Sequence, residues 1–122
     1  MTLVIDYGAG NMRSVINALD ELGETPVVSD DPAAVAKAER IILPGVGAMK
    51  PAMARLREKG LDKALTDAVR GRDVPILGIC LGMQMMCSVG YEGGEPVPGL
   101  GWIDGDVVLL EGAPPALRVP HF

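Results

Sequence analysis

Aromatic side chains are scarce in this sequence of 122 residues, where Phe, Trp and Tyr together make up only 3 %. Hydrophobic residues as a whole make up 48 %, so the chain can bury a core. That core must therefore be built from Val, Ile, Leu, Ala and Met. The length fits one domain, residues 1–122, and leaves no room for a second.

Clusters of positive charge are also missing, and the net charge is −5. Because binding to a phosphate backbone needs clustered Lys and Arg, we expect no nucleic-acid partner. The first six residues carry no basic region, and no long apolar run follows them. We therefore expect neither a signal peptide nor a membrane span. The composition is typical of a cytoplasmic enzyme or enzyme subunit.

Cysteine and histidine are rare, which limits the chemistry available. The two cysteines, Cys80 and Cys87, form neither a disulfide framework nor a Cys-x-x-Cys redox pair. The single histidine, His121, stands next to the last residue. A base at that position is held by nothing downstream, so we assign His121 no catalytic role.

Short apolar runs alternate with segments of helical periodicity. The runs predict strands at residues 3–5, 26–28, 41–43, 74–79 and 107–110. The periodicity predicts helices at 12–22, 30–38, 48–59, 61–70 and 81–89, with Asn11 as an N-cap and Gly23 at the C′ position of the first. Apolar strands alternating with helices indicate an α/β fold, a flavodoxin-like open parallel sheet with helices on both faces. Ligands bind at the carboxyl ends of such strands.

The strongest local signal is Gly78-Ile79-Cys80-Leu81-Gly82, which has the Gly-x-nucleophile-x-Gly form. A side chain at the tip of a sharp strand-to-helix turn needs small residues two positions to either side. The helix N-terminus there favours the thiolate, which is the nucleophilic form. The alternative is a buried structural cysteine between incidental glycines. Cys87 follows two methionines, and core packing is the better interpretation for it.

Two glycine-rich segments follow predicted strands. Pro44-Gly45-Val46-Gly47 exposes backbone N–H groups of the kind that stabilise an oxyanion, although an ordinary turn would look the same. Gly8-Ala9-Gly10 lacks the third glycine of a dinucleotide fingerprint, because Arg13 stands in its place. Phosphate binding is therefore poorly supported.

These segments occur in a characteristic order with others. The full set is Tyr7-Gly8-Ala9-Gly10-Asn11, Leu43-Pro44-Gly45-Val46-Gly47-Ala48, Gly78-Ile79-Cys80-Leu81-Gly82-Met83-Gln84, Glu92-Gly93-Gly94 and Val97-Pro98-Gly99-Leu100-Gly101. Together they resemble the glutaminase subunits of imidazole glycerol phosphate synthase, which are class I (triad) glutamine amidotransferases of histidine biosynthesis. The resemblance covers essentially the whole chain.

The resemblance implies a role for each matching residue. Cys80 would attack the side-chain amide of glutamine, and the N–H groups of Gly47 and Leu81 would form the oxyanion hole. Gln84 and Glu92 would contact the substrate. The preceding residues Pro44, Gly45 and Val46 would belong to a loop that rearranges on activation. Ammonia would pass to a (β/α)8-barrel cyclase subunit, the partner in a heterodimer. No cofactor and no metal are implied.

The same family continues past Phe122, and its catalytic His and Glu lie in that later part. We therefore expect an incomplete domain, at best a very poor glutaminase, with part of its sheet uncovered and a tendency to associate. Two alternatives remain open. One is an interaction module that docks on the cyclase without hydrolysing glutamine. The other is a cysteine enzyme of the DJ-1 type, against which the Pro44–Gly47 loop and Gln84 speak.

Overall fold

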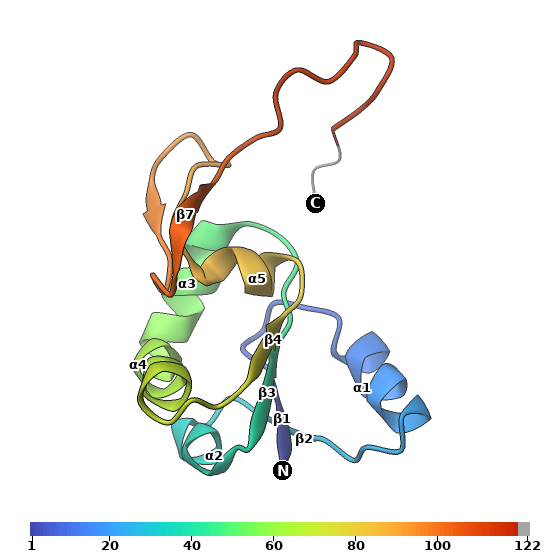
Figure 1. The fold of residues 1–122 in the computed structure, drawn as a ribbon, viewed down its shortest axis with the longest axis vertical. Coiled ribbons are helices and arrows are strands. Elements are labelled where there is room, and N and C mark those ends of the chain that lie inside the picture. The colour runs from blue at the N-terminus through green and yellow to red at the C-terminus, as the bar shows by residue number, and fades with distance from the viewer. Residues whose placement is uncertain (120–122) are drawn as a thin grey trace.

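A four-stranded parallel sheet forms the centre of the computed structural model, which describes residues 1–119. The strands are β1 (Thr2–Ile5), β2 (Val27–Ser29), β3 (Arg40–Leu43) and β4 (Ile76–Gly78), in the order β2-β1-β3-β4. All three neighbouring pairs are parallel, so the carboxyl ends of the strands meet at one edge (Figure 1). The predicted α/β fold with an open parallel sheet is confirmed.

Successive residues of a strand point to opposite sides of the sheet, and here consecutive residues are apolar, so both faces are apolar and both are covered by helices. Leu3, Ile5 and Leu43 join a large core with α2 (Pro32–Lys37), α3 (Met49–Glu58), α4 (Leu61–Thr66) and the π-helical turn η1 (Asp67–Gly71). On the other face, Val4 and Ile42 pack against Leu19 of α1 (Met12–Glu21). In Figure 1, α1 stands on one side of the sheet, and α2 and α4 stand on the other.

The first helix has the ends that the sequence predicts. The Asn11 side chain accepts a hydrogen bond from the N–H of Ser14 at 3.3 Å and so caps the N-terminus. Gly23 follows the helix with a φ of 77°, and its N–H donates to the carbonyl of Asp20. A left-handed glycine at this position is the common way to end a helix.

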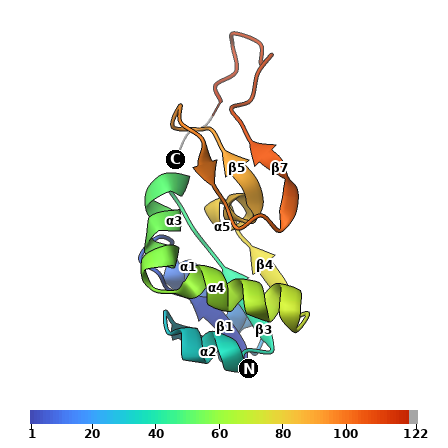
Figure 2. The same ribbon diagram turned by 90° about the vertical axis from the view of Figure 1, so that its left-hand side faces the viewer.

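A second, smaller sheet lies beyond the carboxyl ends of the parallel strands, next to α3 (Figures 1 and 2). Its strands are β5 (Cys87–Gly90), β6 (Val97–Pro98) and β7 (Ile103–Val107), in the order β6-β5-β7. The prediction of one helix over residues 81–89 is therefore wrong, because α5 spans only Leu81–Met85. Residues 87–90 instead pair with β6 on one side and β7 on the other, and this tertiary pairing outweighs the local apolar pattern.

The prediction of a strand at residues 107–110 is also wrong. The strand is β7, and it ends at Val107, which pairs with Gly90, the last residue of β5. Beyond that point β5 offers no backbone to pair with, so Val108, Leu109 and Leu110 are exposed. They begin an extended segment that leads away from the body of the molecule (Figure 1).

The edge strand β4 is open on the face that α1 shares. Leu77 is 58 % exposed, and Ile79 just after the strand is also exposed. A groove of about 310 Å³ runs between Leu77 and Leu19 of α1. Within residues 1–119, no helix combines the length and the apolar character that crossing a bilayer requires.

An exposed ion pair joins the end of α3 to the turn before α2. The Lys59 ammonium donates to the Asp30 carboxylate at 2.6 Å. That hydrogen bond lowers the pKa of Asp30 and raises the pKa of Lys59. The Asp30 contribution to stability is thus present above its ordinary pKa and is lost as the pH falls through the lowered value. The Lys59 contribution is lost only as the pH rises through its raised pKa.

Asp30→Asn is accordingly expected to lower the melting temperature slightly at neutral pH, because an exposed pair contributes little. The difference from wild type should vanish in acid, once Asp30 is protonated in both states, and should shrink in high salt. Thermal unfolding between pH 2 and pH 8 measures this. A difference that stays constant across that range would contradict the assignment to the ion pair.

Candidate functional site

Cys80 occupies the point where β4 turns into α5. Its backbone has φ 54° and ψ −114°, a positive-φ conformation that residues other than glycine rarely adopt. Side chains held in such strained turns cluster at functional sites. The Cys80 thiol is exposed. Both features fit the predicted turn for a nucleophile, and neither fits a buried structural cysteine.

The two glycines that flank Cys80 are required by close packing. A Cβ atom on Gly78 would lie 2.7 Å from the backbone nitrogen of Met83. A Cβ atom on Gly82 would overlap the carbonyl oxygen of Leu43. The start of α5 therefore sits directly against β3 and β4, which explains why the motif needs small residues on both sides.

Hydrogen bonds tie this turn to the end of β3 and to the Pro44–Gly47 loop that follows it. The N–H of Ile79 donates to the carbonyl of Leu43 at 3.0 Å, and the N–H of Leu81 donates to the carbonyl of Gly45 at 3.2 Å. The structure thus brings Cys80 and the glycine-rich loop together, as the sequence predicts. It also shows that the Leu81 N–H, a predicted oxyanion donor, has an internal acceptor in this conformation.

The loop has a buried half and an open half. Pro44 and Gly45 are buried, whereas Val46 is 53 % exposed. Gly47 has a φ of 106°, and an added Cβ there would meet nothing within 4 Å. The open half has room to change its backbone conformation.

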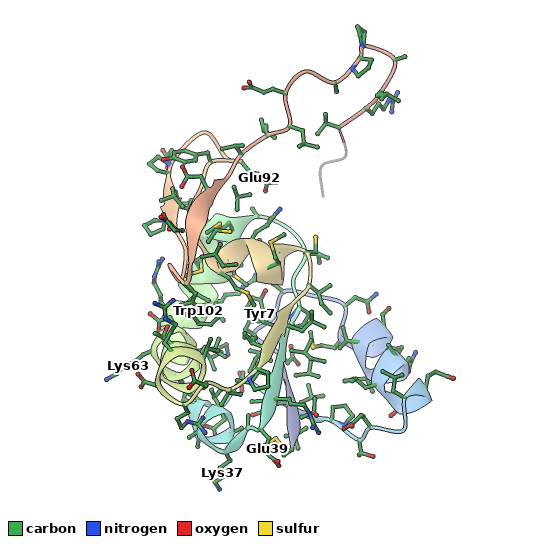
Figure 3. The ribbon with its side chains drawn as sticks, in the orientation of Figure 1. Tyr7, Lys37, Glu39, Lys63, Glu92 and Trp102 are labelled. Atoms are coloured by element: carbon green, nitrogen blue, oxygen red, sulfur yellow. The ribbon has the colours of Figure 1, made fainter. Side chains whose placement is uncertain are left out.

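The sequence alone indicates no role for Tyr7, although Tyr7 opens one of the segments that carry the family resemblance. It lies directly after β1, it is 1 % exposed, and its hydroxyl donates to the carbonyl of Pro44 at 2.8 Å. Figure 3 shows it beneath α5, near the carboxyl ends of the strands. Burial raises the pKa of the Tyr7 phenol, and the nearby Arg55 guanidinium partly opposes this. The phenol is therefore a hydrogen-bond donor at neutral pH.

The two predicted substrate contacts lie in different places. Gln84 is on α5, and its N–H donates to the carbonyl of Cys80 at 3.1 Å. Glu92 follows β5 and lies at the outer end of the second sheet (Figure 3). It lines a cavity of about 120 Å³ together with Ala48, Met49, Lys50, Gly90, Gly93, Glu95, Val97 and Val107. Cys80 is not part of that lining, so this cavity does not bring Glu92 together with the cysteine turn.

The second cysteine has a structural environment. Cys87 is 8 % exposed and belongs to β5, where it pairs with Ile103 of β7. The interpretation of Cys87 as a core residue is confirmed, although its element is a strand and not a helix. His121 lies outside the described residues. Among residues 1–119, no group of three His, Cys, Asp or Glu side chains is placed to hold a metal ion.

Comparison with known proteins supports the resemblance to glutamine amidotransferases that the sequence segments indicate. A profile of the family described as glutamine amidotransferase class-I matches residues 3–97. An imidazole glycerol phosphate synthase subunit HisH from Salinibacter ruber is 46 % identical over 125 residues, covering 99 % of this chain and 56 % of the relative. The corresponding subunit from Symbiobacterium thermophilum is 51 % identical over 120 residues, covering 98 % of this chain and 54 % of the relative.

The chain thus spans just over half the length of these curated relatives. A crystal structure of a glutamine amidotransferase superposes with a TM-score of 0.72 at 20 % identity, covering 85 % of this chain and 54 % of that one. At that identity the likeness shows the fold alone. Because the family profile matches well over half of the sequence, the chain belongs to the class-I glutamine amidotransferase family.

Proposed function

We propose that this chain carries the nucleophile half of a glutaminase that releases ammonia from glutamine. One observation carries the proposal: an exposed cysteine with positive φ, whose next residue, Leu81, is hydrogen-bonded to a glycine-rich loop at the carboxyl ends of a parallel sheet. This arrangement supports a nucleophile with backbone N–H groups close enough to serve as oxyanion donors. The family membership supports an amide substrate.

The reaction proceeds in two steps. The Cys80 thiolate attacks the side-chain amide carbon of glutamine, and the carbon–nitrogen bond then breaks to leave a thioester. The departing nitrogen takes up a proton and leaves as ammonia. Water next adds to the thioester carbon, and the carbon–sulfur bond breaks to give glutamate and the free thiol. A general base must move these protons, and we assign that role to none of residues 1–119.

The oxyanion of each tetrahedral intermediate needs two donors, for which we propose the N–H groups of Gly47 and Leu81. The Leu81 N–H is bonded to the Gly45 carbonyl at 3.2 Å, so it would be shared between that carbonyl and the oxyanion when substrate binds. The open half of the loop, Val46 and Gly47, supplies the backbone freedom that would bring the Gly47 N–H to the oxyanion.

Glutamine itself is held by Gln84 and Glu92 in this proposal. Gln84 is one helical turn from Cys80, and its N–H donates to the carbonyl of Cys80. Glu92 supplies a carboxylate to the lining of the cavity of about 120 Å³, and a carboxylate is the group that pairs with the α-ammonium of glutamine.

We further propose that the ammonia is used by a partner. The relatives are named as subunits of imidazole glycerol phosphate synthase, which supports a heterodimer with a (β/α)8-barrel cyclase in histidine biosynthesis. The products would be imidazole glycerol phosphate and an aminoimidazole carboxamide ribotide. The protein would work in the cytoplasm, without a metal or an organic cofactor.

A direct test is glutamate release from glutamine by the complete protein, with and without the cyclase. We expect turnover that depends on Cys80 and rises when the cyclase is present. Absence of glutamine turnover in the assembled complex would overturn the proposed function.

A further inference from the structure

The buried half of the glycine-rich loop is fixed from below by a single aromatic side chain. The Tyr7 hydroxyl donates to the carbonyl of Pro44 at 2.8 Å. The α-carbon of the next residue, Gly45, faces both that hydroxyl and Leu81. A Cβ on Gly45 would overlap the Tyr7 hydroxyl and would come within 3.1 Å of the Leu81 Cβ. Tyr7 therefore touches the loop at the residue that receives the Leu81 N–H.

We propose that Tyr7 is a positioning residue for glutamine hydrolysis, which holds the Pro44–Gly45 end of the loop so that only Val46 and Gly47 rearrange. This inference rests on the proposed function and adds a residue to it. The oxyanion donors must lie within a few tenths of an ångström of their productive places. A loop fixed at one end meets that demand more readily than a loop that is free throughout.

Three observations make the hydroxyl a fixed support. Tyr7 is 1 % exposed, so water does not compete for its hydrogen bond. Burial raises the pKa of the phenol above its ordinary value, so the hydroxyl stays a donor from neutral into alkaline pH. The segment that carries it is itself held, because the Arg55 guanidinium of α3 donates to the carbonyl of Gly8 at 3.1 Å. The support runs from α3 through the loop after β1 to Pro44.

Tyr7→Phe removes the hydroxyl and keeps the ring. In the complete protein with its cyclase, we expect kcat for glutamine to fall roughly 10–100-fold, less than the 10²–10³-fold of a deleted oxyanion donor. KM for glutamine should change by no more than about twofold, because the loss is confined to the transition state. Alkylation of Cys80 by iodoacetamide needs no oxyanion donor, so its rate should also stay within about twofold.

Thr66→Val is the matched control, because it deletes a part-buried hydroxyl that accepts from the Trp102 indole N–H at 3.1 Å, away from the loop. It should leave kcat unchanged. An unchanged kcat in Tyr7→Phe would overturn the inference and leave the proposed function standing. Equal losses in kcat and in alkylation, or an equal loss in the control, would show a merely structural role and would also overturn it. A wild type without glutamine turnover would overturn both.

If Tyr7→Phe fails to fold, a measurement on the wild type tests whether the Pro44–Gly45 end of the loop is the fixed end. Amide hydrogen exchange is expected to be at least about tenfold slower at Gly45 and Leu81 than at Val46 and Gly47, because the first pair belongs to the fixed part. Equal exchange at all four amides would overturn the inference.

Discussion

Cys80→Ser is expected to lower glutamine hydrolysis about 10⁴-fold or more in the complete protein, the scale seen when a nucleophile of a catalytic triad is removed. Serine fits the same turn, but its hydroxyl ionises far less readily than a thiol, so the attacking anion is scarce. Synthesis of imidazole glycerol phosphate by the proposed cyclase partner, when it is supplied with added ammonia, should be unaffected, because that route bypasses Cys80. Steady-state assays with glutamine and with ammonium salt measure both.

Cys87→Ala is the control for that experiment. Cys87 lies in β5 and is buried, so its loss should cost some stability and leave glutamine turnover close to wild type. Turnover that survives in Cys80→Ser, or that is lost in Cys87→Ala, would require a different nucleophile.

Gly82→Ala is expected to be the most damaging single methyl addition near the site. The new Cβ would overlap the carbonyl oxygen of Leu43, which is backbone and cannot rotate away. Either α5 or β3 must move, and overpacking of this kind costs about 3 kcal/mol in the free energy of unfolding. Denaturant unfolding followed by circular dichroism measures it. The same shift would disturb the bond between Ile79 and Leu43, so Cys80 should also lose reactivity.

Gly71→Ala is the matched control. Gly71 ends η1, its φ is not in the left-handed region, and an added Cβ would meet nothing within 4 Å. This variant should be neutral or slightly stabilised, because alanine restricts the unfolded chain. Equal stability changes in the two variants would contradict the packing described around Gly82.

The parallel sheet could be predicted from the sequence because its signals are local. The apolar runs at β1, β3 and β4 are short and bounded by turn residues, and Asn11 and Gly23 mark the ends of α1 through backbone chemistry that needs no distant contact. The turn at Cys80 was equally predictable, since its glycines are required by the local approach of α5 to β3.

The second sheet could not be predicted in the same way. Residues 87–90 form a strand only because β6 and β7 arrive on either side, and β7 ends where β5 ends. Such pairing depends on distant partners, and the local apolar pattern of these residues is equally compatible with a helix. Tyr7 was missed for a related reason, because its importance lies in one hydrogen bond to Pro44, 37 residues along the chain.

The most direct test of the central claim is covalent labelling by a chloroketone analogue of glutamine, followed by digestion and mass spectrometry of the peptides. The analogue places its electrophilic carbon where the glutamine amide would lie, so it reports which thiol faces a bound substrate. We predict that Cys80 is labelled, that Cys87 is not, and that excess glutamine protects Cys80. Preferential labelling of Cys87, or labelling of Cys80 that glutamine does not slow, would contradict the assignment of Cys80 as the glutamine nucleophile.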